Sequence, residues 1–88
     1  MARRAVVHGA VHGVGFRIFA ERTARALAVR GWVRNLPDGS VETVAEGDEA
    51  AVAEYLALLT RGPASARVDR VDVETVTPRH FTDFEVTR

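Results

Sequence analysis

The alternation between strand-like and helix-like spacing of apolar residues limits this chain to few folds. A valine-rich run at 4–11 ends in glycines, which is typical of a buried strand. Apolar residues at helical spacing then predict a helix over 16–27. The runs at 32–36 and 40–46 flank a Pro-Asp-Gly turn, which indicates a β-hairpin. The first half of the chain therefore reads strand, helix, strand, strand.

A second helix and two more strands are predicted in the rest of the chain. Asp48 can cap the helix, and the Gly-Pro pair at 62–63 would end it. Apolar and polar residues alternate over 71–75, as in a strand. Val68 is out of phase with them and indicates either a turn before the strand or a β-bulge. The alternation at 84–86 predicts a short edge strand.

This order of elements favours an α+β fold, the ferredoxin-like βαββαβ sandwich. Two helices would cover one face of a four- to five-stranded antiparallel sheet. In that fold the first two strands run parallel with the third between them, so their C-terminal ends lie at the same sheet edge, about 9–10 Å apart. We therefore expect the glycine turn after the first strand and Asn35 at the end of the second to meet at one small pocket. The length predicts a single domain, residues 1–88.

The charge balance and the missing residue types exclude several functions. Twelve basic and twelve acidic residues cancel, so no global field draws the chain to nucleic acid or to a membrane surface. All the basic residues are arginines, which excludes a lysine nucleophile or Schiff base. There is no cysteine, which excludes thiolate chemistry and is compatible with the cytoplasm, where we expect the protein to act. No apolar run reaches the roughly 18 residues of a membrane span, and nothing in the sequence requires more than a monomer.

The segment VHGVGFR, residues 11–17, predicts a local anion site. Successive backbone N–H groups of a glycine turn, the positive end of a helix and a guanidinium all attract a small oxyanion, most simply phosphate. A positive charge at a helix N-terminus is unfavourable unless an anion compensates it. The position of Arg17 therefore favours a binding role over a solvated side chain.

Three segments resemble the sequence blocks of the acylphosphatase family in order and spacing. They are GAVHGVGFR at 9–17, GWVRNLPDG at 31–39 and GPASARVDRV at 62–71. The resemblance spans nearly the whole chain and implies hydrolysis of a small acyl phosphate to a carboxylate and inorganic phosphate, with no metal and no other cofactor. It implies that Arg17 holds the phosphoryl group and that Asn35 orients the attacking water. The backbone amides implied in phosphate binding belong to His12, Gly13, Val14, Gly15, Phe16 and Arg17.

The chemistry of acyl phosphates agrees with so sparse a site. The leaving group departs as a carboxylate, a stable anion, so it needs no general acid. The oxygens of the phosphoryl group can take the proton of the water. The protein is left to position the water and to stabilise charge, which two side chains and a loop of amides can do.

Three positions depart from the family pattern. His12 stands where glutamine is commoner; the contact expected there is through the backbone, so we assign the imidazole no catalytic role and leave open an effect on pH dependence. Ala28 stands where glycine is frequent, and a left-handed alanine would cost about 1 kcal/mol unless the cap is rearranged. Leu36 replaces a frequent threonine, which removes any hydroxyl support for Asn35 from that position.

Alternative interpretations remain beside this one. The glycines could serve only a tight turn, and Asn35 could be only a turn former. His8 and His12, four apart on a strand, would lie about 13 Å from each other, too far to share a metal ion. The carboxylates at 42–49 indicate a solvated acidic face. An RNA-recognition module is disfavoured, since the runs at 4–11 and 40–46 contain no aromatic residue.

One rival function stays open at this point. It is a small-anion-binding regulatory module on the same fold without turnover, or a stand-alone relative of the acylphosphatase-like domains of hydrogenase-maturation proteins.

Overall fold

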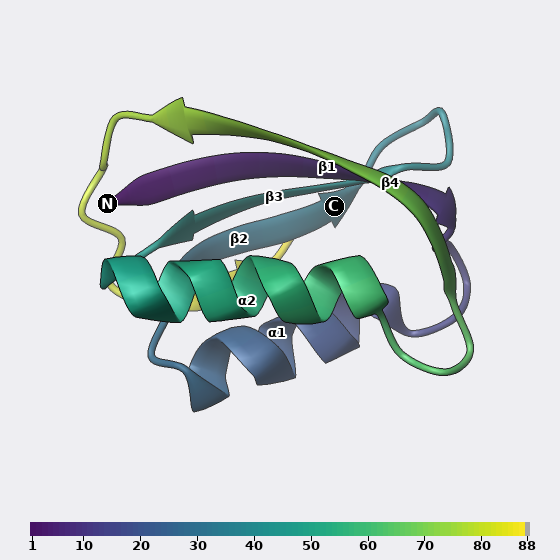
Figure 1. Cartoon of the computed structure of the whole chain (residues 1–88), viewed down its shortest axis with the longest axis horizontal. Helices are drawn as coiled ribbons and strands as arrows, with labels where there is room; N and C mark the ends of the chain where they lie inside the picture. The colour runs from purple at the N-terminus through teal and green to yellow at the C-terminus, as the bar shows by residue number, and fades with distance from the viewer. Residues whose placement is uncertain (88) are drawn as a thin grey trace.

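The computed structural model describes residues 1–87 as one sheet with two helices on one face (Figure 1). The helices α1 and α2 lie side by side along the sheet. Every predicted element is present. The elements are β1 (Ala2–Ala10), α1 (Phe16–Ala26), β2 (Arg30–Asn35), β3 (Val41–Glu46), α2 (Glu49–Arg61), β4 (Arg67–Val76) and β5 (Phe84–Val86).

The strand order β4-β1-β3-β2-β5 confirms the ferredoxin-like arrangement. Strands β1 and β2 both pair antiparallel with β3 between them, so they run parallel to each other. The expectation of a wholly antiparallel sheet was wrong in one respect, because β5 pairs parallel with β2. After β4, at one edge of the sheet, residues 77–83 carry the chain to the opposite edge, where β5 starts at the same end of the sheet as β2.

Strand β4 contains the β-bulge that the phase of Val68 indicated. His8 pairs with Arg70 and Gly9 pairs with Val68, which leaves Asp69 as the extra residue. A Cβ on Gly9 would lie 2.1 Å from the carbonyl oxygen of Arg67, so the close approach of the two backbones requires glycine. A bulge adds local twist, and it does so here at the end of β1, where the glycine loop leaves the sheet.

The core lies between the sheet and the two helices. Each helix buries one face at helical spacing, as its sequence predicted. Tyr55 is fully buried and donates to the hydroxyl of Thr43 at 2.8 Å, and that hydroxyl donates to the carbonyl oxygen of Trp32, also at 2.8 Å. Burial raises the pKa of Tyr55 far above its usual range, so the phenol stays a donor. The buried helix residues are Phe16, Ala20 and Ala24 of α1 and Val52, Tyr55 and Leu59 of α2.

The helix ends differ from each other in how they are capped. Asp48 occupies the N-cap position of α2 as predicted, yet its side chain makes no capping hydrogen bond. Gly62 ends α2 with a positive φ of 69°. At the end of α1, Ala28 has φ 57°, while its own N–H donates to Arg25 and that of Val29 donates to Ala24 at 2.8 Å. These bonds form a Schellman motif, so the cap is not rearranged and the alanine adopts the left-handed conformation.

The second face of the sheet carries buried carboxylates, which corrects the expectation of a wholly solvated acidic face. Glu42 and Glu46 are 5% and 3% exposed, whereas Asp48 and Glu49 are exposed. Glu42 accepts hydrogen bonds from Arg4 and Arg34. Glu46 accepts the backbone N–H groups of residues 79, 80 and 81. Both carboxylates therefore have structural partners.

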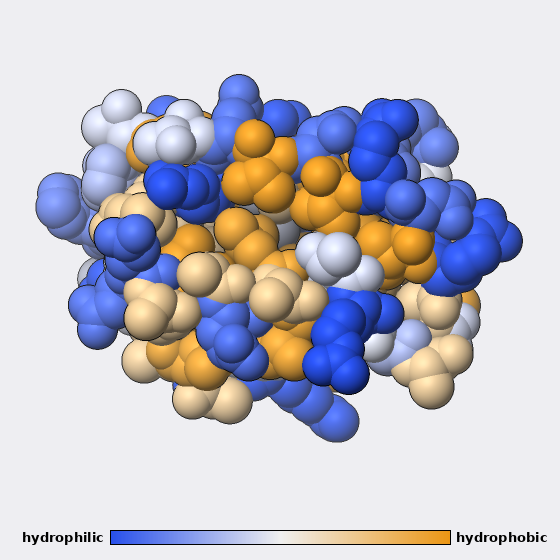
Figure 2. Space-filling model, viewed as in Figure 1, coloured by the Kyte–Doolittle hydropathy of each residue, from blue (hydrophilic) through white to orange (hydrophobic). Residues whose placement is uncertain are grey.

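The side that carries the helices is not evenly polar. Figure 2 shows apolar side chains gathered there between the β4 edge of the sheet and α2. Val73 of β4 is 49% exposed, and its partner Ala5 on β1 is fully buried beneath the helices. Helix α2 therefore leaves part of β4 uncovered. Within residues 1–87, neither helix is long and apolar enough to cross a membrane.

Candidate functional site

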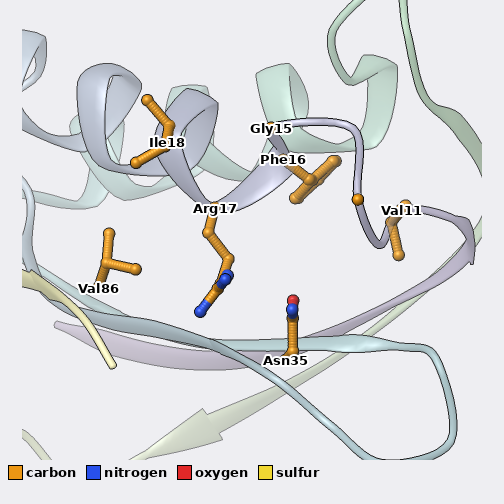
Figure 3. Close-up of a pocket in the computed structure, with 8 residues that line it drawn as sticks. Val11, Gly15, Phe16, Arg17, Ile18, Asn35 and Val86 are labelled. Atoms are coloured by element: carbon orange, nitrogen blue, oxygen red, sulfur yellow. The ribbon is translucent and has the colours of Figure 1, made fainter. Parts of the chain in front are cut away.

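A small cavity of about 130 Å³ opens where β1 and β2 end. It lies between the glycine loop, the first turn of α1 and strands β2 and β5 (Figure 3). Arg17 from the helix and Asn35 from the strand point toward one another across it. The structure thus brings these two residues to one pocket, as the strand order predicted. The lining residues are Val11, Gly13, Gly15, Phe16, Arg17, Ile18, Asn35 and Val86.

The glycine loop has the backbone geometry of an anion-binding turn. Gly13 and Gly15 have φ of 69° and 75°, and nothing lies within 4 Å of a Cβ placed on either. Glycine is therefore required at these two positions because the backbone is left-handed, and not because a side chain would lack space. Within residues 1–87, none of the N–H groups of residues 12–17 donates to another group of the protein. Such a loop leaves several donors to be satisfied by a ligand or by water.

The N-terminus of α1 is left uncompensated. Gly15 occupies the N-cap position and offers no side chain, and the first turn contains no acidic residue. The partial positive charge of the helix end therefore faces the cavity without a negative partner from the helix itself.

Arg17 is half-buried in the first turn of α1. Its Nη1 donates to the carbonyl oxygen of Thr87 at 3.3 Å, which directs the side chain toward the sheet. Among residues 1–87, no carboxylate forms an ion pair with this guanidinium. Its remaining donors can therefore bind an anion in the cavity.

Asn35 is the last residue of β2 and is half-buried. No hydrogen bond to its carboxamide is found within the described part of the chain, residues 1–87, so the amide is free to hold a water molecule. The turn that follows Asn35 is held by its own hydrogen bonds. The N–H of Leu36 donates to the carbonyl oxygen of Ser40 at 2.9 Å, and Asp38 accepts the N–H and the hydroxyl of Ser40.

His12 and Val14 do not line the cavity. Their side chains serve other contacts. The Nε2 atom of His12 lies 2.7 Å from the carbonyl oxygen of Ser40 and donates to it, since a carbonyl has no proton. Val14 packs against the core, and its carbonyl oxygen accepts the hydroxyl of Ser65 at 2.9 Å. Neither contact was predicted from the sequence, although the glycine turn and Asn35 were expected at the same sheet edge.

The cavity walls also include three residues that were not predicted at the site. Val11, Ile18 and Val86 line the space beside the polar groups. Phe16, whose backbone N–H was among the predicted phosphate ligands, is 1% exposed and belongs to both the core and the wall. The apolar character of the other three was visible in the sequence, but the position of Val86 at the cavity depends on where β5 joins the sheet.

The histidines do not form a metal centre with each other. Within residues 1–87, no three histidine, cysteine or acidic side chains lie close enough to hold a metal ion. His8 lies on the other face of the sheet, where its ring contacts Asp72 at 3.1 Å. A larger hollow of about 450 Å³ on that face includes Trp32 and Phe81 and none of the predicted site residues.

Comparison with known proteins extends the likeness over nearly the whole chain. The sequence profile of the Acylphosphatase family matches residues 3–86. An acylphosphatase of Thermotoga petrophila is 48% identical over 80 residues, which are 91% of this chain and 89% of that protein. The crystal structure of acylphosphatase from Bacillus subtilis has a TM-score of 0.95 at 32% identity and covers 99% of this chain and 98% of that one. T. kodakarensis HypF matches with a TM-score of 0.87 at 33% identity, over 100% of this chain and 12% of that protein.

Proposed function

The chain belongs to the acylphosphatase family, and we infer that it hydrolyses acyl phosphates to a carboxylate and inorganic phosphate. The observation that carries this inference is the cavity itself. Within residues 1–87, loop amides without an acceptor and an arginine without a carboxylate partner lie on one side of it, and an asparagine whose carboxamide has no hydrogen bond lies on the other.

We assign the binding of the phosphoryl group to Arg17 and the backbone N–H groups of residues 12–17. The N–H groups have no acceptor within residues 1–87, and the helix end adds positive potential. The small volume supports this assignment, because a cavity of about 130 Å³ accepts a phosphoryl group while the acyl part extends toward solvent.

Asn35 is assigned to the attacking water. The water oxygen forms a bond to phosphorus as the bond between phosphorus and the acyl oxygen breaks, and the acyl group leaves as a carboxylate. The proton of the water goes to an oxygen of the phosphoryl group, so no protein acid or base is required. Donors fixed before the reaction stabilise the developing charge, and one such donor is worth about 3–4 kcal/mol in the transition state.

We also propose a domain organisation, an oligomeric state and a compartment for the protein. Residues 1–88 would act as a single domain and as a monomer in the cytoplasm. One continuous hydrophobic core supports the single domain. The absence of cysteine is compatible with a reducing compartment.

The test is hydrolysis of benzoyl phosphate by purified protein with a metal chelator present. We expect turnover by the wild type and a loss of at least about 100-fold in Arg17→Ala and in Asn35→Ala, since both remove a group that acts on the transition state. Arg22→Ala is the matched control, because Arg22 is exposed on the same helix away from the cavity. Circular dichroism checks that each variant is folded.

The two variants should differ in binding. Asn35→Ala should retain affinity for inorganic phosphate, whereas Arg17→Ala should lose it. Full activity in Arg17→Ala would contradict the mechanism. An inactive wild type that binds phosphate tightly would favour the regulatory module.

A further inference from the structure

The glycine loop, residues 11–15, and the turn after Asn35 are joined by one side-chain hydrogen bond. His12 belongs to the loop, and its Nε2 donates to Ser40 across 28 positions of sequence at 2.7 Å. Ser40 is 3% exposed, and the same carbonyl oxygen accepts the N–H of Leu36, the residue directly after Asn35. The imidazole therefore bonds to an atom that is already fixed within the hairpin.

The loop is otherwise attached through apolar side chains, because Val11 and Phe16 are each 1% exposed and Val14 packs against the core. Its own N–H groups, residues 12–17, make no bond to the protein within residues 1–87, and its glycines leave the backbone free. The contact from Ser65 to Val14 fixes the far side of the loop. Within residues 1–87, the bond from His12 is the side-chain hydrogen bond that joins the loop to the β2–β3 turn.

We propose that His12 is a positioning residue that sets the distance between the bound phosphoryl group and the water held by Asn35. The inference rests on the proposed function. The imidazole does not line the cavity and its Nε2 is occupied by a carbonyl, so it acts through the hairpin and not on the substrate. Its hydrogen bond to Ser40 supports the turn that holds Asn35. Leu36 has no hydroxyl group that could give such support.

The geometry predicts a particular kinetic effect. The groups that bind phosphate all lie on the loop and α1. Loss of the hydrogen bond from His12 to Ser40 therefore leaves these groups together, and KM should stay nearly unchanged. The water is held by Asn35 of β2, which lies across this hydrogen bond from the loop. Its alignment with phosphorus is therefore lost, and kcat falls. A displacement of about 1 Å between reacting groups can cost up to about 100-fold in rate.

The test compares His12→Phe, which keeps a planar ring without a donor, with His12→Gln, which has an amide donor. With benzoyl phosphate we expect His12→Phe to lower kcat by about 10- to 100-fold with KM within about twofold, and His12→Gln to recover most of kcat. His8→Phe is the matched control and should keep the wild-type kcat, because His8 lies on the other face of the sheet with Asp72. Should His12→Phe fail to fold, His12→Ala takes its place with the same expectation.

A measurement without substrate separates this inference from the proposed function. Long-range ¹H–¹⁵N NMR at a pH where the imidazole is neutral should show the proton on Nε2 of His12. An unprotonated Nε2 overturns this inference even if the enzyme is active. A wild-type kcat in His12→Phe, or a raised KM with unchanged kcat, also overturns it and leaves acyl phosphate hydrolysis standing. An inactive wild type with the proton on Nε2 contradicts the proposed function and retains the hydrogen bond from His12 to Ser40.

Discussion

Ala28 shows how a single residue can carry a measurable strain. Its φ of 57° places a Cβ in the left-handed region, while the hydrogen bonds of the Schellman motif hold it there. Glycine at the same position would keep those bonds without the steric cost. The residue is exposed, so the change removes no core packing.

We therefore expect Ala28→Gly to raise the free energy of unfolding by about 0.5–1 kcal/mol, even though glycine also gains entropy in the unfolded chain. Urea denaturation followed by circular dichroism measures it. Ala57→Gly is the matched control and should lower stability by about 1 kcal/mol, since Ala57 is exposed in the interior of α2. Equal destabilisation by both changes would show that the cap is not strained.

At the scale of the elements, β3 makes polar contacts on both of its faces, to helix α2 on one and to strands β1 and β2 on the other. Thr43 points to the helices and bonds Tyr55, whereas Glu42 points to the other face and bonds Arg4 and Arg34. Each contact joins β3 to a neighbouring element, and each can be tested separately.

Tyr55→Phe should lower the free energy of unfolding by about 0.5–1.5 kcal/mol. The change keeps the ring against Phe84 but removes the donor to the buried hydroxyl of Thr43. Chemical denaturation measures the loss. Adding Thr43→Val to Tyr55→Phe should cost less than the sum of the two single changes, because the partners are in contact. Strict additivity would contradict the bond.

The Glu42 cluster should make stability depend on pH. Burial raises the pKa of Glu42, but the hydrogen bonds from Arg4 and Arg34 lower it more, so the folded-state pKa lies below the usual value. The unfolded chain then binds more protons in acid. The stabilisation is present above the ordinary carboxyl pKa of about 4 and is lost as the pH falls through the folded-state pKa.

Urea denaturation between pH 7 and pH 3 checks this expectation. Glu42→Gln should be less stable at pH 7 by about 1–3 kcal/mol, because it removes hydrogen bonds to charged groups, and should lose less on acidification than the wild type. Identical acid profiles for the two proteins would exclude this carboxylate as a source of the pH dependence.

At the scale of the whole molecule, the anion site should be coupled to folding. Its donors come from the loop, α1 and β2, which are together only in the folded state. Inorganic phosphate should therefore raise the melting temperature of the wild type, and a concentration of 100 times Kd adds about 2.7 kcal/mol. Arg17→Ala should show little of this shift. Differential scanning fluorimetry in phosphate, against chloride of equal ionic strength, measures it, and equal shifts in both proteins would argue against the site.

The sequence by itself determined the order of the elements, the strand order and the meeting of Arg17 with Asn35. Hydrophobic spacing sets which residues face the core, and the twist of strands and the short turns leave few ways to connect them. It also indicated a turn or a bulge at Val68, because the residue is out of phase with the strand. The family resemblance marked Ala28 as a left-handed alanine unless the cap was rearranged, and the structure decided between the alternatives in both cases.

Only the tertiary structure decided the parallel pairing of β5, the burial of Glu42 and the bond from His12 to Ser40. These features depend on polar atoms from distant parts of the chain coming within about 3 Å. The spacing of apolar residues determines which face of the sheet a side chain lies on. The partner of a polar atom on that face depends on strand twist and turn geometry, and the apolar pattern carries no information about these.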